Sequence, residues 1–198
     1  MQDLIRTGTL EDGSEVTVRA RTSDDFDACF EFYQAIPDSE KLLMRVDVTD
    51  RQAVEDRWKD IERSNAGRLI AVRQGKVIGE AVLEQMRYGW LRKTGEIRII
   101  ALPEYCDTPV VNLLAKEIFL LAARSGLNHI LSRVLDGEAW LINILKKLYF
   151  EHQATQRLHA VDHSGEAHDV LVMTFSLHKM WEGLEEAIEQ SISSPREY

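Results

Sequence analysis

The sequence predicts an α/β fold in which helices flank a mixed β-sheet, and three observations predict it. Segments with apolar residues at every second position, typical of strands, alternate with segments whose apolar residues recur every three or four positions, typical of helices. A chain of 198 residues can bury the core of one domain without a disulfide or a metal. Hydrophobic residues make up 44% of the chain and charged residues 29%, which is too apolar for a disordered protein.

The N-terminal part predicts a hairpin and then a helix. Residues 4–10 and 15–20 flank an Asp12-Gly13 pair, and Asp-Gly tolerates the positive φ angles of a tight turn. The run Thr22-Ser23-Asp24-Asp25 is typical of a helix N-terminus, and Pro37 ends the helix that follows it.

A second helix is expected to begin at Thr49, because Thr49 and Gln52 have the spacing of a capping box. Its buried face is expected to contain Val54, Trp58 and Ile61. Beyond it, alternation predicts strands over residues 68–73, 77–86, 96–102, 129–134, 155–161 and 170–177. Helices are predicted from Thr108-Pro109 to the capping glycine Gly126, over residues 138–148 and over residues 179–191.

No internal repeat, low-complexity stretch or linker interrupts this order, so residues 1–198 are expected to form a single domain. Its core is expected over about residues 14–177, and residues 178–198 are expected to be a C-terminal helix and tail. An apolar stripe on that helix, made by Trp181, Leu184 and Ile188, either covers the core of its own chain or forms a homodimer contact.

The charge balance excludes two classes of partner. The chain carries 24 basic and 33 acidic side chains, a net charge of −9, so no basic stripe for nucleic acid or an anionic membrane surface is expected. The longest apolar run, residues 118–123, is too short to span a membrane, and charged residues near the N-terminus indicate no secretory signal. With two cysteines, Cys29 and Cys106, the sequence is typical of a reducing compartment, and a cytoplasmic protein is expected.

Short motifs in the predicted order resemble the GNAT (GCN5-related N-acetyltransferase) superfamily over about residues 14–177. Gly79-Glu80-Ala81, the strand over residues 96–102 and Pro103-Glu104-Tyr105 look like the family's third strand, fourth strand and the turn into its acyl-CoA loop. Leu148-Tyr149-Phe150 looks like the Leu-Gly-Phe that closes the last core helix. The opening Asp12-Gly13 with Val16-Thr17-Val18-Arg19 is similar to the acetyltransferase domain of bacterial protein-lysine acetyltransferases.

This resemblance implies a mainly antiparallel, twisted GNAT-type sheet with an extra N-terminal strand and a C-terminal helix. It also implies an N-acyltransferase that uses acetyl-CoA or another acyl-CoA as cosubstrate and acts on a small-molecule amine or a protein lysine. Glu96 stands where many members place a glutamate that acts as general base. The alternative is a strand-end carboxylate paired with Arg98 or Arg92. By position, the residues implied for coenzyme A binding are Ile100, Leu102, Asp107, Thr108, Val110 and Val111.

The sequence departs from the family pattern at the loop that binds pyrophosphate. The family's loop begins with Gln or Arg and carries glycine or alanine later, where Cys106, Pro109 and Val111 stand here. Pro109 has no N–H to donate, and Val111 adds a branched side chain where close approach is needed. Thr108 is expected to cap the following helix, and Asp107 adds a negative charge near the phosphates. These changes predict weakened coenzyme A binding.

The residues around the expected chemistry leave further alternatives. Leu145 stands where many members have a tyrosine acid, and Glu138 replaces an asparagine at the start of the same helix. Tyr149 either supplies the missing acid or packs in the core, and Cys106 is either a reactive thiol or an inert small residue. The spacing of His159, His163 and His168 does not match a zinc site, so no metal is expected.

Two functions therefore remain open: an acyl-CoA-dependent N-acyltransferase with a degenerate pyrophosphate loop, and a GNAT-fold binding or regulatory module that has lost catalysis. An open cleft between the strand before Pro103 and the strand that starts at His129 favours the first. A cleft plugged by Val111, Leu113 or Tyr105 favours the second.

Overall fold

The elements follow the order expected from the sequence, apart from a short helix at Asp38–Lys41 that was not expected. The structure is a computed structural model that describes residues 5–41, 44, 46–62, 67–85, 88–161, 165–178 and 180. Its strands are β1 (Ile5–Thr9), β2 (Glu15–Ala20), β3 (Gly67–Arg73), β4 (Lys76–Gln85), β5 (Thr94–Ala101), β6 (His129–Leu135), β7 (Glu151–Val161) and β8 (Ala167–Ser176). Its α-helices are α1 (Phe26–Ala35), α2 (Asp38–Lys41), α3 (Arg51–Glu62), α4 (Pro109–Arg124) and α5 (Ala139–Lys147), and 3₁₀ turns are η1 (Ser23–Asp25), η2 (Gly89–Leu91) and η3 (Pro103–Tyr105).

The strands form one sheet in the order β1-β2-β3-β4-β5-β6-β8-β7. Every neighbouring pair is antiparallel except β5 and β6, which run parallel and pair only over residues 94–96 and 129–131. Beyond Glu96, β5 continues along β4 while β6 continues along β8. The two middle strands therefore separate, and the predicted mixed, mainly antiparallel sheet is confirmed.

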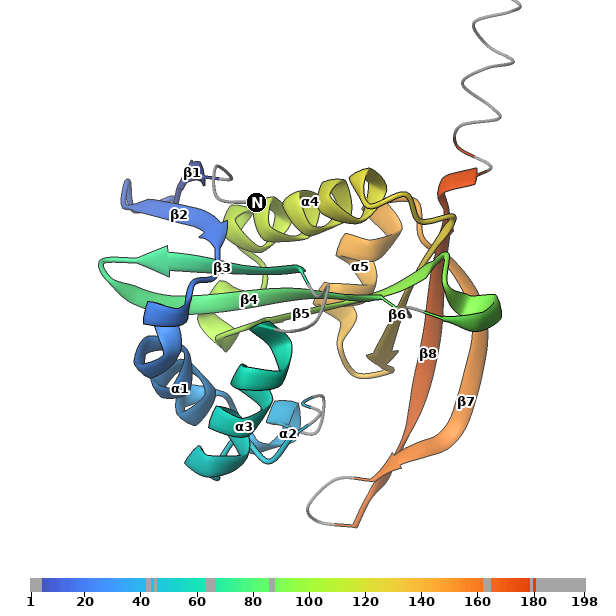
Figure 1. Cartoon of the computed structure of the whole chain (residues 1–198), viewed down its shortest axis with the longest axis horizontal. Coiled ribbons are helices and arrows are strands. Elements are labelled where there is room, and N and C mark those ends of the chain that lie inside the picture. Colours follow the sequence, from blue (N-terminus) through green and yellow to red (C-terminus); the bar gives the residue numbers. More distant parts are fainter. Residues whose placement is uncertain are drawn as a thin grey trace, which may run out of the picture.

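Helices cover both faces of the sheet (Figure 1), with α4 and α5 on one face and α1, α2 and α3 on the other. The faces differ because neighbouring residues of a strand point to opposite sides. Toward α4, strands β3 to β5 present an apolar set, namely Leu69, Ala71, Ala81, Leu83, Ile97 and Ile99. Toward α1 and α3, apolar Ile70 and Ile100 alternate with charged residues, namely Arg68, Glu80, Glu84 and Arg98. One core is therefore fully apolar, and the other contains buried charge.

Some details differ from the sequence-based expectation. Helix α3 begins at Arg51 and the backbone N–H of Gln52 donates to Asp50 at 2.8 Å, whereas the Thr49 hydroxyl donates to Asp47 at 2.6 Å. The expected Thr49–Gln52 capping box is wrong because an aspartate next to the helix is the better-placed acceptor. The closing hairpin is longer than predicted, since β7 and β8 begin at residues 151 and 167.

Other predictions fall on parts of the chain that the structure does not describe. These are the Ile61 side chain and, apart from Met180, the helix over residues 179–191 with its apolar stripe. In the described ranges, no helix has the length and apolar character needed to cross a membrane.

The expected N-terminal signature of the first helix is present as a network centred on Asp25. Arg19 donates two hydrogen bonds to the Asp25 carboxylate, at 2.7 and 2.6 Å, and the Thr22 backbone N–H and hydroxyl donate at 2.7 and 2.9 Å. The hydrogen bonds from Arg19, followed by those from Thr22, lower the pKa of Asp25 from 3.8 to about 2. This network fixes where the chain leaves β2 and enters α1.

We expect Asp25→Asn to lower the free energy of unfolding at pH 7 by about 2 kcal/mol, because it removes the charge that these donors stabilise. The folded pKa lies below the unfolded value, so this contribution is complete above about pH 4 and is lost as the pH falls toward 2. Urea unfolding of both proteins between pH 7 and pH 2 measures the difference. A gap that stays constant over that range would contradict the assignment.

Candidate active site

The separation of β5 and β6 creates a cleft on the sheet face that carries α1 and α3. A cavity of about 250 Å³ lies there, with residues of β5 on one wall and residues of β6 on the other. Its lining includes Glu96, Arg98 and Ile100 of β5 and Ser132 and Arg133 of β6. Because β5 keeps β4 on its other side throughout, one backbone edge of its C-terminal half faces this cleft without a strand partner among the described residues. An exposed strand edge of this kind offers hydrogen bonds to an extended ligand.

Glu96 lies at the point where the two strands part. Its side chain is 15% exposed, and Nη1 of Arg133 donates to both carboxylate oxygens at 2.8 Å. Of the partners expected from the sequence, Arg98 donates to Glu84 at 2.8 Å and Arg92 to the Gly89 carbonyl at 3.3 Å. Arg133 lies on the strand that pairs in parallel with β5, so only the fold brings it to Glu96.

The loop between β5 and α4 offers few donors to an anion. Thr108 is the N-cap residue of α4, but its hydroxyl donates to the Tyr105 carbonyl at 2.7 Å and makes no cap to the helix. The expected self-capping by Thr108 is therefore wrong. Pro109, the next residue, is exposed but has no N–H. Val110 and Val111 are 2% and 1% exposed, backbone included, so their N–H groups face protein rather than solvent.

The other residues expected at a coenzyme A site lie along the same path. Ile100 lines the cleft, and the backbone N–H of Leu102 donates to the Ile78 carbonyl at 3.0 Å. Asp107 is exposed beside the start of α4. Of the residues expected at a coenzyme A site, only Ile100 lines the cleft cavity, whereas Asp107 and Pro109 are exposed at the start of α4.

None of the residues expected to plug the cleft does so. Val111 is buried in the core beneath α4, and Leu113 and Tyr105 pack against that same core. The Tyr105 hydroxyl accepts a hydrogen bond of 2.9 Å from Arg73, which holds the ring away from the cavity lining. The cleft between β5 and β6 is therefore open at these positions.

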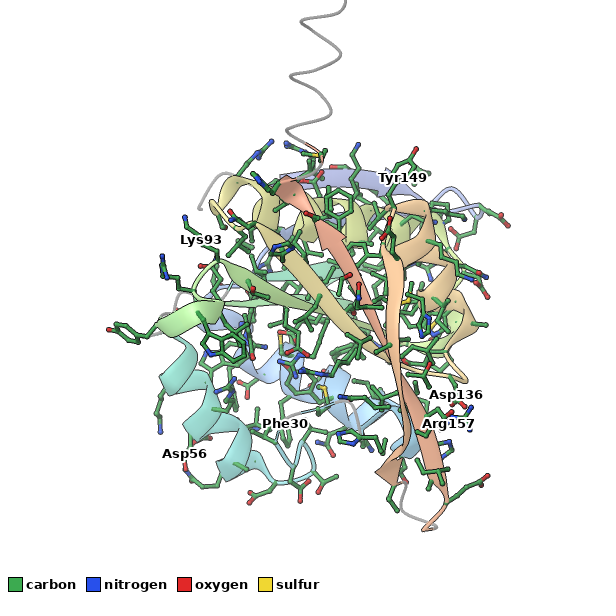
Figure 2. All side chains as sticks on the ribbon, turned by 90° about the vertical axis from the view of Figure 1, so that its right-hand side faces the viewer. Phe30, Asp56, Lys93, Asp136, Tyr149 and Arg157 are labelled. Carbon is green, nitrogen blue, oxygen red and sulfur yellow. The ribbon has the colours of Figure 1, made fainter. Side chains whose placement is uncertain are left out.

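The position of the usual tyrosine acid carries no acid here. Leu145 is completely buried, and the Glu138 carboxylate accepts a hydrogen bond of 2.9 Å from the backbone N–H of Leu135. Tyr149 is 81% exposed, so the prediction that it packs in the core is wrong. Its φ of +62° is the left-handed conformation that glycine adopts easily, which fits its place in a Leu-Gly-Phe-like ending. Figure 2 shows Tyr149 near the top of the view and Asp136, which follows β6, well below it.

The cysteines and histidines singled out in the sequence lie in different surroundings. Cys106 is 7% exposed, with its sulfur 3.6 Å from the Leu102 carbonyl oxygen, which agrees with the inert alternative. Burial raises the pKa of the Cys29 thiol well above its ordinary value, so this thiol stays protonated. His159 lines the cleft cavity, and His163 lies outside the described residues.

Sequence reasoning missed a second, smaller cavity of about 50 Å³ that continues from the cleft under α1 and α3. We call it the arginine pocket, lined by Arg21, Tyr33, Met44, Val46, Val48, Val54, Arg57, Trp58, Arg68, Glu80, Val82, Arg98 and Ile100. It shares Met44, Arg98 and Ile100 with the cleft cavity. One signal in the sequence could have revealed this pocket. Strands β3 to β5 carry charged residues at positions that point into the protein, where core strands are ordinarily apolar.

Comparison with known proteins supports the fold. No protein-family model matches the chain. Among solved structures, an N-acetyltransferase from Staphylococcus aureus Mu50 superposes with a TM-score of 0.70 at 14% identity, covering 82% of this chain and 98% of that one. An acetyltransferase of the GNAT family from Streptococcus pneumoniae gives 0.67 at 19% identity, covering 81% and 99%.

A further match is a structure of a putative acetyltransferase from Salmonella typhimurium with its cofactor acetyl-CoA, with a TM-score of 0.68 at 19% identity, covering 82% of this chain and 94% of that one. These similarities span most of both chains. The chain therefore has the fold of the GNAT acetyltransferases.

Proposed function

We propose that this protein is an acyl-CoA-dependent N-acyltransferase that acts on an amine in the cleft between β5 and β6. The observation that carries the proposal is the cleft itself, which is open, borders an unpaired strand edge and holds Glu96 in its wall. Acetyl-CoA is the cosubstrate we favour, since a structure of similar fold contains it. The ordinary role of such an edge is to bind an extended chain through its backbone groups.

In this proposal Glu96 accepts a proton from the ammonium form of the acceptor, which leaves the nitrogen lone pair free to attack. A bond forms between that nitrogen and the acyl carbon, and the bond between the acyl carbon and sulfur breaks as the tetrahedral intermediate collapses. The positively charged nitrogen gives its extra proton to water, and water returns a proton to the departing thiolate, because the aliphatic Leu145 cannot donate one. The products are an amide and free coenzyme A.

The loop before α4 sets the affinity for the cosubstrate in this account. With no N–H at Pro109 and with Val110 and Val111 buried, the pyrophosphate meets fewer donors than a helix N-terminus ordinarily offers. Most of the binding energy must then come from the cleft.

We expect Pro109→Ala to tighten coenzyme A binding about tenfold, because it restores one exposed N–H and a hydrogen bond to a charged oxygen contributes about 1.5 kcal/mol. Titration calorimetry of both proteins with coenzyme A measures the change. Pro37→Ala, which removes a proline far from the loop at the end of α1, is the control and should leave the affinity unchanged. An affinity that does not respond to Pro109→Ala would show that this N–H is not the missing donor.

The transferase proposal is tested by incubating the purified protein with acetyl-CoA and a panel of amines, covering amino acids, polyamines and lysine-containing peptides. The expected result is release of free thiol that depends on one class of amine, with the acetylated amine found by mass spectrometry. Binding of coenzyme A with no transfer to any amine would overturn the proposal.

A second candidate is a binding or regulatory module that has lost catalysis. The specific observation in its favour is the loop, where three consecutive positions from Pro109 present no accessible N–H. It predicts that coenzyme A does not bind, whereas the transferase requires that it does.

A further inference from the structure

The arginine pocket is rich in positive charge, although the whole chain carries a net charge of −9. Four of its lining residues are arginines and one, Glu80, is acidic. The cleft beside the pocket adds Arg133 and Glu96, and Glu84 pairs with Arg57 and Arg98. Together these residues comprise five arginines, Arg21, Arg57, Arg68, Arg98 and Arg133, and three glutamates, Glu80, Glu84 and Glu96. This part of the described structure therefore has two more positive charges than negative ones.

The deepest of these charges are Arg21 and Arg68, whose side chains are 6% and 10% exposed. Both contact the Glu80 carboxylate, Arg68 at 3.1 Å and Arg21 only at 3.5 Å, and Arg68 also lies 4.0 Å from the Glu84 carboxylate. The Nε of Arg68 is buried and has no hydrogen-bond partner within the described part of the chain. Buried guanidinium groups are costly unless their charges and donors are matched, so the pocket is incomplete as it stands.

Arg21 is held in a fixed orientation. Its guanidinium group stacks over the ring of Trp58 at 3.6 Å, and burial lowers its pKa from the ordinary value, because the charge is poorly solvated. Glu80 is held in turn by the Tyr33 hydroxyl, which donates to it at 2.9 Å. A stacked guanidinium keeps its N–H donors in one plane, an arrangement that suits a planar carboxylate.

We propose that the arginine pocket binds a carboxylate group of the acceptor, so that the amine to be acylated belongs to an amino acid. This inference rests on the proposed function, and it names the class of acceptor. The arginine pocket and the cleft share Arg98 and Ile100, so one molecule can place its carboxylate at the arginines and its amine toward Glu96.

The strand register sets how far apart the amine and the carboxylate of the acceptor must lie. Arg68 pairs with Val82 of β4, and Val82 pairs with Arg98 of β5, so the Arg68 backbone lies two strands, about 10 Å, from that of Arg98. An acceptor that reaches both Glu96 and Arg68 therefore needs several bonds between its amine and its carboxylate. The pocket volume of about 50 Å³ admits a small group such as a carboxylate and not an extended chain.

Other acceptors fit less well. A polyamine would place positive charge beside arginines that are already in excess, which is unfavourable in a buried site. A lysine side chain within a protein has no carboxylate a few bonds from its amine. The positive charge of the pocket, and not the net negative charge of the chain, thus decides which class of amine is bound.

Binding of matched pairs of compounds tests the proposal without requiring turnover. Each of the twenty amino acids and its decarboxylated amine is added to the full-length protein with coenzyme A present, and binding is measured by saturation-transfer NMR and calorimetry. The expected result is at least one amino acid that binds more than about tenfold tighter than its amine, the least that a charge-assisted pair of this kind contributes. If no amino acid outbinds its amine, the proposal is wrong.

Variants locate the carboxylate. Arg68→Met keeps most of the side-chain volume and should reduce amino-acid binding at least about tenfold. Arg51→Gln is the matched control, because Arg51 is half-exposed on α3 and pairs with Asp27 outside the pocket. Should Arg68→Met fail to fold, the wild-type protein is titrated with acetate, and the Nε–H resonance of Arg68 is expected to shift. An Arg68 signal that does not respond to saturating acetate would overturn the assignment.

These outcomes separate the two proposals. If polyamines or peptides are acetylated and amino acids are not bound, the transferase proposal is supported and carboxylate binding in the arginine pocket is contradicted. If amino acids bind through Arg68 but no acyl group is transferred, carboxylate binding is supported and the transferase proposal is contradicted.

Discussion

Replacing Glu96 with glutamine is expected to lower kcat/KM for acyl transfer by about 10²–10⁴-fold, the usual contribution of a positioned general base. The amide keeps the shape of the side chain and can still accept a hydrogen bond from Arg133, but it cannot take a proton from the amine. Coenzyme A binding is expected to change little, because Glu96 lies in the wall of the cleft and away from the loop before α4.

The measurement is the initial rate of thiol release with saturating and limiting amine, together with calorimetry of coenzyme A. Glu31→Gln, on the exposed side of α1, is the matched control and should behave as the wild type. A transfer rate that is unchanged in Glu96→Gln would show that the base lies elsewhere.

The second large effect concerns Glu80, which is 2% exposed and is the carboxylate shared by Arg21 and Arg68. We expect Glu80→Ala to lower the free energy of unfolding by about 3–5 kcal/mol, because it removes the carboxylate that pairs with the buried Arg21 and leaves the buried Arg68 only the more distant Glu84 at 4.0 Å. Chemical denaturation followed by tryptophan fluorescence measures this, since Trp58 stacks on Arg21.

Tyr33→Phe is the control for packing and removes only the hydroxyl that donates to Glu80. Burial, followed by the nearby Glu80 charge, raises the pKa of Tyr33 well above its ordinary value, so the phenol stays protonated and the loss is that of one hydrogen bond. We expect a smaller cost of about 1.5–3 kcal/mol. If Glu80→Ala cost no more than Tyr33→Phe, the charge network would not be the stabilising feature.

Much of the fold was predictable because local signals agreed with the final structure. The turn at Asp12-Gly13, the Thr22–Asp25 network and the strand alternation of β3 to β5 each use residues close in sequence. The Thr49 capping box failed because Asp47 and Asp50 compete for the same backbone and hydroxyl donors, and spacing alone does not rank acceptors.

The part of the site that lies on a single strand, β5, was predictable from the sequence, and the parts that come from several strands were not. The position of Glu96 follows from the strand that ends at Pro103, but its partner Arg133 is brought by the parallel pairing of β5 with β6. The arginine pocket escaped prediction because its charges come from the end of β2, α3, β3, β4 and β5, and only the assembled sheet shows that they face one cavity.

Titration calorimetry of the purified protein with coenzyme A and acetyl-CoA, at physiological salt, tests the central claim most directly. The transferase account predicts binding with micromolar affinity, carried by the cleft between β5 and β6 despite the loop at Pro109. An absence of binding at millimolar cosubstrate would contradict it and leave the binding module as the function of this fold.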